Sequence, residues 1–354
     1  MKILVINPGS TSTKIAVYDM DKELFSKSIE HSKEELAPFK KISDQLEFRK
    51  ETILKALKEA GFDLSEFACI SARGGNIHPV PSGTYIVNEK MVQDMLSLKY
   101  GAHPSNLGAP IAYELARQYN IPAFIVDPVV VDEMEMVNKI TGLKGILRQA
   151  KDHPLNQKAV SREVAKSLGK KYEECNFVVA HLGGGISVAA HRKGRIIDVN
   201  NALNGDGPFS PERAGDLPNV SVVEMCFSGN YTKEEILKML AGNGGFVSHL
   251  GTNSLKEVLS RIEQGDEYAK LVYDAMVLQI SKWIGIMAVV LKGEVDGIIL
   301  TGGMAKSEKL VNDIKEYVKF IAPVYTVAGE FEMKALMEGA LRVLRGEEEA
   351  KTYE

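Results

Sequence analysis

Two stretches of this sequence follow one pattern: Lys2–Tyr18 (KILVINPGSTSTKIAVY) and Asn176–His191 (NFVVAHLGGGISVAAH). In each, an apolar run leads into a turn of small residues, and a second apolar run follows. The turns are Pro8–Thr13 and Leu182–Gly185. Apolar runs joined by such turns are typical of antiparallel strands. A third strand is expected after each pair, at Leu24–Ile29 and Arg195–Asp198. Because the pattern returns after about half of the chain, it predicts two duplicated domains and not a solenoid.

Helices and further strands are expected between and after these meanders. Apolar residues at helical spacing predict helices, each stopped by a glycine or a polar turn, at Glu47–Ala60, Ala109–Tyr119, Asn156–Leu168, Tyr268–Leu291 and Phe331–Leu344. Strands are expected at Phe67–Ser71, Phe124–Asp127 and Gly297–Leu300, the last followed by a glycine turn and a helix that starts near Ser307. Alternation of strands and helices predicts an α/β fold.

These elements suggest a division of the chain into two domains. We expect a first domain at residues 1–148, to which the C-terminal helix (332–354) returns, and a second domain at 149–331. The long apolar helix Tyr268–Leu291 is expected to be buried, and the charged run Glu347–Glu349 to be solvated.

Composition excludes several classes of protein. The chain has 354 residues, 45% of them apolar and 25% charged, and a net charge of −4, so it has no basic face for nucleic acid or an anionic membrane. Its three cysteines lie far apart without zinc spacing, which fits a reducing compartment. The N-terminal apolar stretch is too short for a signal peptide, and the longest apolar run, Ile284–Leu291, is too short to span a bilayer. We therefore expect a cytoplasmic protein.

The two glycine turns are candidate phosphate sites. Asn7–Lys14 (NPGSTSTK) offers hydroxyls, backbone amides and a close approach at Gly9, although it lacks the spacing of a Walker loop. Gly183–Gly185 leaves amides bare as an anion nest, and His181 stands beside it. Each stretch alone could be an ordinary hairpin turn, but two such turns facing one cleft can hold a polyphosphate from two sides.

Loop arginines and histidines are further candidates. Arg73 follows the strand Phe67–Ser71, and Arg213 lies in a Gly/Pro-rich loop; two guanidinium groups could neutralise a phosphoryl group in transfer. His103, Asp127 and His153 each stand at a break between elements, where functional side chains gather. Each is equally compatible with a structural role in a loop.

Together the motifs resemble the acetate and butyrate kinase family, whose fold belongs to the actin, hexokinase and Hsp70 superfamily. The resemblance covers essentially the whole chain, and its motifs, in order, are NPGSTSTK (7–14), SARGG (71–75), GAHPSNLGAPIA (101–112), HPLNQKAV (153–160), AHLGGGISVAAH (180–191), PERAGDLP (211–218), LTGGMA (300–305) and GEFEMKAL (329–336). It implies two duplicated ribonuclease H-like domains, with the active site in the cleft between them. It also implies ATP and Mg²⁺ as cofactors, a short-chain carboxylic acid as substrate, and a homodimer or larger homo-oligomer.

The resemblance also implies roles for individual residues. Asn7 and Ser10 would lie beside metal and phosphates, with Ser12 and Lys14 in the same loop and Glu332 helping to hold magnesium. Arg213 would contact the transferred phosphoryl group, with His153 and His181 around it and Asp127 orienting an arginine. His103 would lie near the acyl acceptor, Gly183, Gly184 and Gly185 near the phosphates, and Gly302 and Gly303 near adenosine.

The sequence departs from acetate kinases at three places. Their arginine three residues before His-Gly-Gly is absent, since Ile70 and Arg73 occupy this region, and we expect Arg73 to bind carboxylate or phosphate instead. Gly184 replaces an asparagine. Ala102 replaces a bulky residue before His103, which leaves room for a longer acid; about 0.8 kcal/mol per buried CH₂ favours four carbons over two by roughly tenfold.

The resulting hypothesis is ATP-dependent formation of butyryl phosphate by direct in-line transfer. The alternatives are an acetate, propionate or isobutyrate kinase and, outside enzymes, an Hsp70-like nucleotide-switched binding module, for which no residues remain to build a peptide-binding domain. A sugar kinase would need a carboxylate base, and the sequence offers no compelling candidate.

Overall fold

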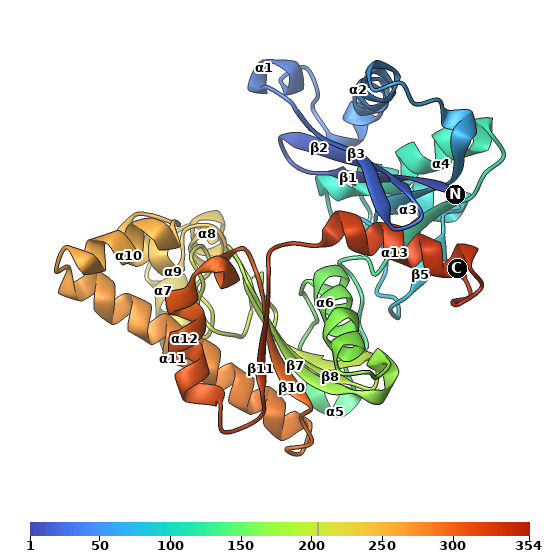
Figure 1. Cartoon of the computed structure of the whole chain (residues 1–354). Coiled ribbons are helices and arrows are strands. Elements are labelled where there is room, and N and C mark those ends of the chain that lie inside the picture. Colours follow the sequence, from blue (N-terminus) through green and yellow to red (C-terminus); the bar gives the residue numbers. More distant parts are fainter. Residues whose placement is uncertain (204) are drawn as a thin grey trace. The chain divides into compact units, whose positions relative to one another are not determined.

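The computed structural model describes residues 1–203 and 205–354 and divides into two compact units (Figure 1). The N-terminal unit comprises Met1–Val131 with Phe331–Glu354, and the C-terminal unit comprises Asp132–Glu330. The C-terminal helix belongs to the first unit. The first boundary falls at residue 131 and not at 148, because the intervening segment bonds to the second unit: Glu135 N donates to Ile197 O at 3.1 Å, and Glu133 pairs with Lys158 at 2.9 Å.

The N-terminal unit is built on one mixed sheet. The strand order is β12-β5-β6-β4-β1-β2-β3, in which β1, β2 and β3 form an antiparallel meander and β4 and β6 extend it in parallel. Its strands are β1 (Lys2–Pro8), β2 (Ser12–Asp19), β3 (Lys22–Glu30), β4 (Phe67–Arg73), β5 (Thr84–Ile86), β6 (Ala123–Val126) and β12 (Lys351–Thr352). Its helices are α1 (Lys33–Leu36), α2 (Leu46–Glu59), α3 (Glu89–Leu96), α4 (Gly108–Gln118) and α13 (Glu332–Leu344).

The C-terminal unit is built on a second sheet with strand order β11-β10-β7-β8-β9. Its strands are β7 (Asn176–Leu182), β8 (Ile186–Arg192), β9 (Arg195–Val199), β10 (Gly297–Gly302) and β11 (Val324–Ala328). Its helices are α5 (Met136–Lys139), α6 (Pro154–Ser167), α7 (Asn219–Phe227), α8 (Lys233–Leu240), α9 (Gly245–Leu250), α10 (Leu255–Glu263), α11 (Glu267–Val290) and α12 (Glu308–Val318). Ser307 caps α12 by accepting from Leu310 N, as the sequence predicted.

The two sheets repeat one topology. Strands β3-β2-β1-β4-β6 of the first sheet correspond in order and direction to β9-β8-β7-β10-β11 of the second: an antiparallel meander followed by two parallel strands. The predicted duplication is therefore confirmed at the level of topology.

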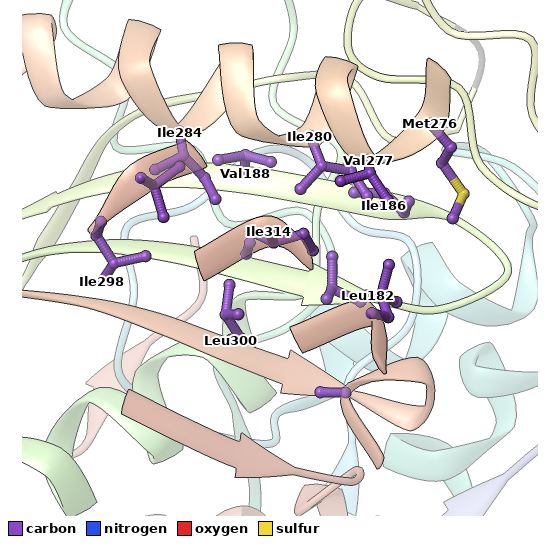
Figure 2. Packing of buried hydrophobic residues seen from close by; sticks show 14 of the residues in the cluster. Leu182, Ile186, Val188, Met276, Val277, Ile280, Ile284, Ile298, Leu300 and Ile314 are labelled. Carbon is purple, nitrogen blue, oxygen red and sulfur yellow. The ribbon is translucent and has the colours of Figure 1, made fainter. Parts of the chain in front are cut away.

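Helix α11 supplies much of the core of the C-terminal unit. Figure 2 shows Met276, Val277, Ile280 and Ile284 of this helix above apolar side chains of the sheet. Although α11 is long and apolar enough to cross a membrane, half of its most apolar window is buried in this core. The helix is buried on the side that faces the sheet, and it also has an exposed apolar face that includes Leu271 and Val289.

The charged tail is only partly solvated. The Glu348 carboxylate accepts from Thr84 N at 2.7 Å and from Arg342 Nε at 2.8 Å. Desolvation raises the pKa of Glu348, but the charge of Arg342 and the hydrogen bonds from Arg342 and Thr84 outweigh it and leave the pKa below its usual value. The expectation that this whole run is solvated was therefore wrong for Glu348, which fastens the chain end to β5.

Candidate functional site

In the N-terminal unit, strand register brings several predicted residues to one face of the sheet. Asn7 and Lys14 are cross-strand partners, and Ile6 of β1 lies opposite Ala72 of β4. Since Ile6 and Ala72 point into the core on one face, the next residues, Asn7 and Arg73, point to the other. Helix α13 covers this second face, where Ser71 Oγ donates to the carbonyl of Leu336 at 2.7 Å.

Glu332, the first residue of α13, joins these side chains. Its carboxylate accepts from Asn7 Nδ2 at 2.7 Å and from Arg73 Nη1 at 2.6 Å. His103 belongs to the same group, because burial and the positive charge of Arg73 lower its pKa while Glu332 opposes the shift. We call Asn7, Lys14, Arg73, His103 and Glu332 the N-terminal cluster. Ile70, which stands where acetate kinases carry their arginine, is fully buried in the core.

The turn at Pro8–Thr13 is held from behind by Arg49, a residue that sequence reasoning missed. The Arg49 guanidinium is fully buried and donates to the carbonyls of Gly9, Ser10 and Ser12 at 2.8, 3.1 and 3.0 Å, and to Thr13 Oγ1 at 3.1 Å. Among the described residues none of its hydrogen-bond partners is a carboxylate, and burial lowers its pKa to about 10. The available signal was an arginine on the apolar side of an otherwise regular helix.

The backbone of the turn leaves Ser10 and Ser12 accessible, whereas Thr13 is buried. Ser10 is exposed and Ser12 is half-buried, while Gly9 N donates to Ser12 O at 2.7 Å and closes the turn. Lys14 is exposed on β2, beside Asn7. The side chains predicted to meet phosphate are thus available to a ligand.

Close packing of glycines joins two other predicted motifs. A Cβ on Gly75 would lie 2.5 Å from Asn106, and one on Gly108 would lie 2.4 Å from the carbonyl oxygen of Arg73. The Asn106 amide in turn accepts from Asn76 N at 2.8 Å. The segments 71–75 and 101–108 therefore pack directly together, which brings His103 and the exposed Ala102 to the side of Arg73.

Asp127 follows β6 in a left-handed conformation (φ 39°) and is buried. Its Oδ1 accepts from Gly83 N at 2.8 Å, and its own N–H donates to Gly83 O at 3.0 Å. This contact fixes the loop before β5. An arginine-orienting role for Asp127 stays a prediction.

In the C-terminal unit, two predicted histidines stack on each other. The rings of His153 and His181 lie 3.8 Å apart and 6° from parallel. His181 is on β7, and His153 precedes the first turn of α6, which packs on the same face of the sheet. Asn156 Nδ2 donates to His181 Nδ1 at 3.0 Å, and His153 Nδ1 lies 2.8 Å from Ser187 Oγ.

The triple-glycine turn lies beside these rings and beside Arg213. A Cβ on Gly183 would lie 3.4 Å from His181 Nε2, and one on Gly185 would lie 3.8 Å from Arg213 Nε. At Gly184 the added carbon would meet the Glu212 carboxylate at 3.2 Å. Arg213 Nε is buried and has no hydrogen-bond partner among the described residues. We call His153, His181, Gly183–Gly185 and Arg213 the C-terminal cluster.

The loop after β10 borders a pocket of about 670 Å³. Gly302 has φ 88°, and a Cβ there would lie 2.4 Å from the carbonyl of Leu182, so only glycine fits this close crossing. Gly303 and Met304 form one wall of the pocket, and Leu255, Lys256 and Leu259 of α10 form another. A nucleoside-sized cavity thus adjoins the predicted adenosine loop.

A family model described as the acetokinase family matches residues 135–324, and the chain is 52% identical over 352 residues to butyrate kinase 1 of Clostridium acetobutylicum, with 99% of each chain covered. The chain belongs to the acetokinase family.

Solved structures of the same fold agree with this membership. An acetate kinase from Porphyromonas gingivalis superposes with a TM-score of 0.77 at 18% identity, covering 97% of this chain and 99% of the other. A propionate kinase from Francisella tularensis gives 0.74 at 18% identity, covering 96% and 98%. The expected fold class, with two related actin-like halves, is therefore confirmed for this acetokinase.

Proposed function

We propose that this acetokinase transfers the γ-phosphoryl group of ATP to butyrate, giving butyryl phosphate and ADP. The observation that carries the proposal is the buried Arg213 Nε, which has no acceptor in the described part of the chain and lies beside the Gly183–Gly185 turn and the stacked histidines. A buried donor left unpaired costs about 1–3 kcal/mol, and an anionic substrate group would satisfy it. Family membership supports ATP as donor and a carboxylate as acceptor.

The acceptor needs no general base. A short-chain carboxylic acid, with a pKa close to that of a Glu side chain, is already ionised at neutral pH. The barrier is the approach of one anion to another, so positive groups and oriented N–H donors provide most of the catalysis. In this proposal Arg213, His153 and His181 stabilise the phosphoryl group, and Arg73 and His103 receive the carboxylate. Asp127 acts as an orienting residue and not as a base.

Magnesium is expected from the family chemistry. Mg²⁺ usually takes one or two protein oxygens together with phosphates and water, so the absence of a group of three or more acidic, histidine or cysteine ligands among the described residues is compatible with it. The Glu332 carboxylate and the Asn7 side-chain oxygen suit this role, because Asn7 donates to Glu332 through nitrogen and keeps its oxygen for a ligand. Bound there with the nucleotide, the ion would neutralise phosphate charge.

Each glycine turn is a candidate contact for the nucleotide phosphates. Ser10, Ser12 and Lys14 offer hydroxyl and ammonium donors, and Gly183–Gly185 offers backbone amides. The adenosine of the nucleotide would occupy the 670 Å³ pocket beside Gly303. The large apolar share of the α10 wall, from Leu255 and Leu259, suits an adenine ring.

The choice of butyrate rests on the 52% identical relative of that name and on the small Ala102. The test is a hydroxamate assay, which traps acyl phosphates, run with ATP and Mg²⁺ over acids of two to five carbons. We expect the highest kcat/KM at butyrate or isobutyrate. A highest kcat/KM at acetate or propionate would refute butyrate as the substrate, but the reaction would still be phosphorylation of a carboxylic acid.

The same assay separates a kinase from an Hsp70-like switch. A kinase forms ADP and acyl phosphate in equal amounts and only when an acid is present. ATP hydrolysis that is slow and indifferent to the acid would reject the kinase proposal. We also propose a cytoplasmic location, because the free cysteines fit a reducing compartment.

A further inference from the structure

Behind the two stacked histidines, two neighbouring amides of α6 approach the sheet. We propose that Asn156 and Gln157 fix His181 and His153 as neutral imidazoles that carry their proton on Nε2. This inference extends the proposed function, since it assigns positioning residues to the histidines of that site. It can be tested separately, because the position of a proton is measurable without substrate.

Strand register lines up the polar groups beneath α6. His181 of β7 is the cross-strand partner of Ser187 of β8 and lies opposite Thr301 of β10, and His191 lies further along β8. All four point to the face opposite the apolar cluster formed with α11, since their neighbours Leu182, Ile186 and Leu300 lie in that cluster. Asn156 and Gln157 are buried above this row.

The orientation of the Gln157 amide follows from a backbone carbonyl. Its nitrogen lies 2.7 Å from Ser187 Oγ and 3.4 Å from the carbonyl oxygen of Ser187, which can only accept. The amide oxygen then faces His191 Nε2 at 2.9 Å, so that nitrogen is protonated and donates. Tyr172 OH, 2.7 Å from His191 Nδ1, donates to the remaining nitrogen. Full burial lowers the pKa of His191 well below its usual value, in keeping with a neutral ring.

The direction of these bonds continues to His153. Ser187 Oγ accepts from Gln157, so its own hydrogen is free to point at His153 Nδ1, 2.8 Å away. A nitrogen that accepts carries no proton, and a neutral His153 therefore has its proton on Nε2.

An independent contact fixes His181 in the same way. Thr301 Oγ1 donates to the carbonyl of Gly329 at 3.4 Å, so it accepts from Asn156 Nδ2 at 3.1 Å. This places the amide nitrogen, and not its oxygen, 3.0 Å from His181 Nδ1. A protonated Nδ1 would meet an N–H group head-on, which disfavours both the other tautomer and the imidazolium.

The result is a pair of parallel neutral donors. The rings lie 3.8 Å apart, where two positive charges would repel each other, and Nε2 of His181 faces the Gly183 end of the triple-glycine turn. A neutral N–H donor can hold a phosphoryl oxygen without taking up or releasing a proton. Hydrogen-bond partners behind metal-ligating histidines contribute roughly tenfold to a hundredfold to activity, and we expect an effect on the same scale for these two rings.

Long-range ¹H–¹⁵N correlation on protein labelled with ¹⁵N-histidine reads the tautomers directly. The chain has 7 histidines, and the variants His153→Gln and His181→Gln assign the two rings by loss of their signals. We expect an unprotonated Nδ1 and a protonated Nε2 for both in the substrate-free protein. Protonated Nδ1 on either ring would overturn the inference for that ring.

Two near-isosteric variants test the assigned amides. Gln157→Glu and Asn156→Asp replace the donating nitrogen by an acceptor, so we expect Gln157→Glu to move the proton of His153 to Nδ1 and Asn156→Asp to do the same for His181. Each should also lower kcat by roughly tenfold to a hundredfold with a smaller change in KM. Ser187→Ala, which cuts the path to His153 without adding charge, should leave that ring in both tautomers.

Ser161→Ala is the matched control. Its hydroxyl donates to the main-chain carbonyl of Gln157 and lies 3.4 Å from His191 Nδ1. Loss of this hydroxyl therefore leaves the side-chain bonds among Gln157, Ser187 and His153 in place. It should keep both tautomers and near-normal kcat. If Asn156→Asp and Gln157→Glu fold and lose activity but keep the tautomers of both rings, Asn156 and Gln157 have a structural role and do not fix the protons. If the tautomers are as inferred but no acyl phosphate forms, the proposed function fails and this inference stands.

Discussion

Arg213 combines a positive charge with a buried Nε that finds no acceptor among residues 1–203 and 205–354. Since its guanidinium is proposed to neutralise the transferring phosphoryl group, Arg213→Ala should lower kcat by roughly 10³-fold or more, on the scale of arginine fingers. Steady-state kinetics with saturating ATP and acid measure the effect. Arg192→Ala, which removes an arginine paired with Glu135 on the same unit, is the control and should stay near wild type. Near-normal turnover of Arg213→Ala would exclude it from the mechanism.

Asp152, next to His153, is expected to make the stability of the protein depend on pH. Both carboxylate oxygens are buried without hydrogen-bond partners among the described residues, although part of the residue is exposed. Desolvation raises its pKa from 3.8 to about 7, against the opposing charge of Lys158. Between these two values the folded state binds more protons than the unfolded state, so stability falls as pH rises from about 4 to about 7 and then levels off.

The corresponding variant is Asp152→Asn, which removes the ionisable group. Denaturant unfolding at pH 5 and pH 8 should show a stabilisation at pH 8 that is larger than at pH 5, by on the order of a few kcal/mol. An equal change at both pH values would mean that Asp152 does not titrate in this range.

Ala102 tests the basis of acid choice. Ala102→Leu fills the space proposed for the third and fourth carbons, so the ratio of kcat/KM for butyrate to that for acetate should fall by roughly tenfold, from about 0.8 kcal/mol per methylene. The acetate reaction serves as the internal control. An unchanged ratio would put the acyl chain elsewhere.

At the scale of elements, helix α2 and the turn between β1 and β2 depend on one buried charge. Arg49 donates to three carbonyls of the turn. Arg49→Gln removes this donor, and each buried carbonyl left unsatisfied costs about 1–3 kcal/mol, so the variant should be clearly destabilised and should raise the KM for ATP more than that for the acid.

Arg49→Lys separates the charge from the bonds. It keeps the positive charge but loses the planar set of donors, so we expect an intermediate loss of stability and of ATP affinity. Lys50→Gln, on the same helix and paired with Glu47 and Glu114, is the matched control and should change stability by about 1 kcal/mol or less. If Arg49→Gln changes the KM for ATP and the KM for the acid equally, Arg49 contributes to folding and not to ATP binding.

The elements themselves were predictable because their signals are local. The period of apolar residues and the glycine stops gave α2, α4, α6 and α11 to within about two residues, and Ser307 marked the start of α12 by its capping chemistry. Arg49 was not predictable in this way. Its place on the apolar side of α2 was a weak local signal, and its partners come from a turn far away in sequence.

At the scale of the whole molecule, the resemblance predicts a homo-oligomer. Helix α11 has apolar side chains left at the surface of its unit, among them Leu271 and Val289, and we expect this face to contribute to an interface. Light scattering after size exclusion should give a mass that is a multiple of 38.8 kDa. Leu271→Asp with Val289→Asp should lower that mass, whereas Lys282→Glu on the same helix should not. A monomeric wild-type protein would contradict the expectation.

The sequence by itself determined the duplicated α/β topology, the glycine turns and the family, because turn chemistry, apolar periodicity and ordered motifs are written in neighbouring residues. It also pointed to Asn7, Arg73, His153, His181 and Arg213. The tertiary structure decided what these residues touch: that Glu332 pairs with Arg73, that the imidazoles of His153 and His181 stack, and that 132–148 belongs to the second unit. The reason is physical: strand register and helix packing join groups that lie far apart along the chain, and hydrogen-bond direction and burial exist only once they are joined.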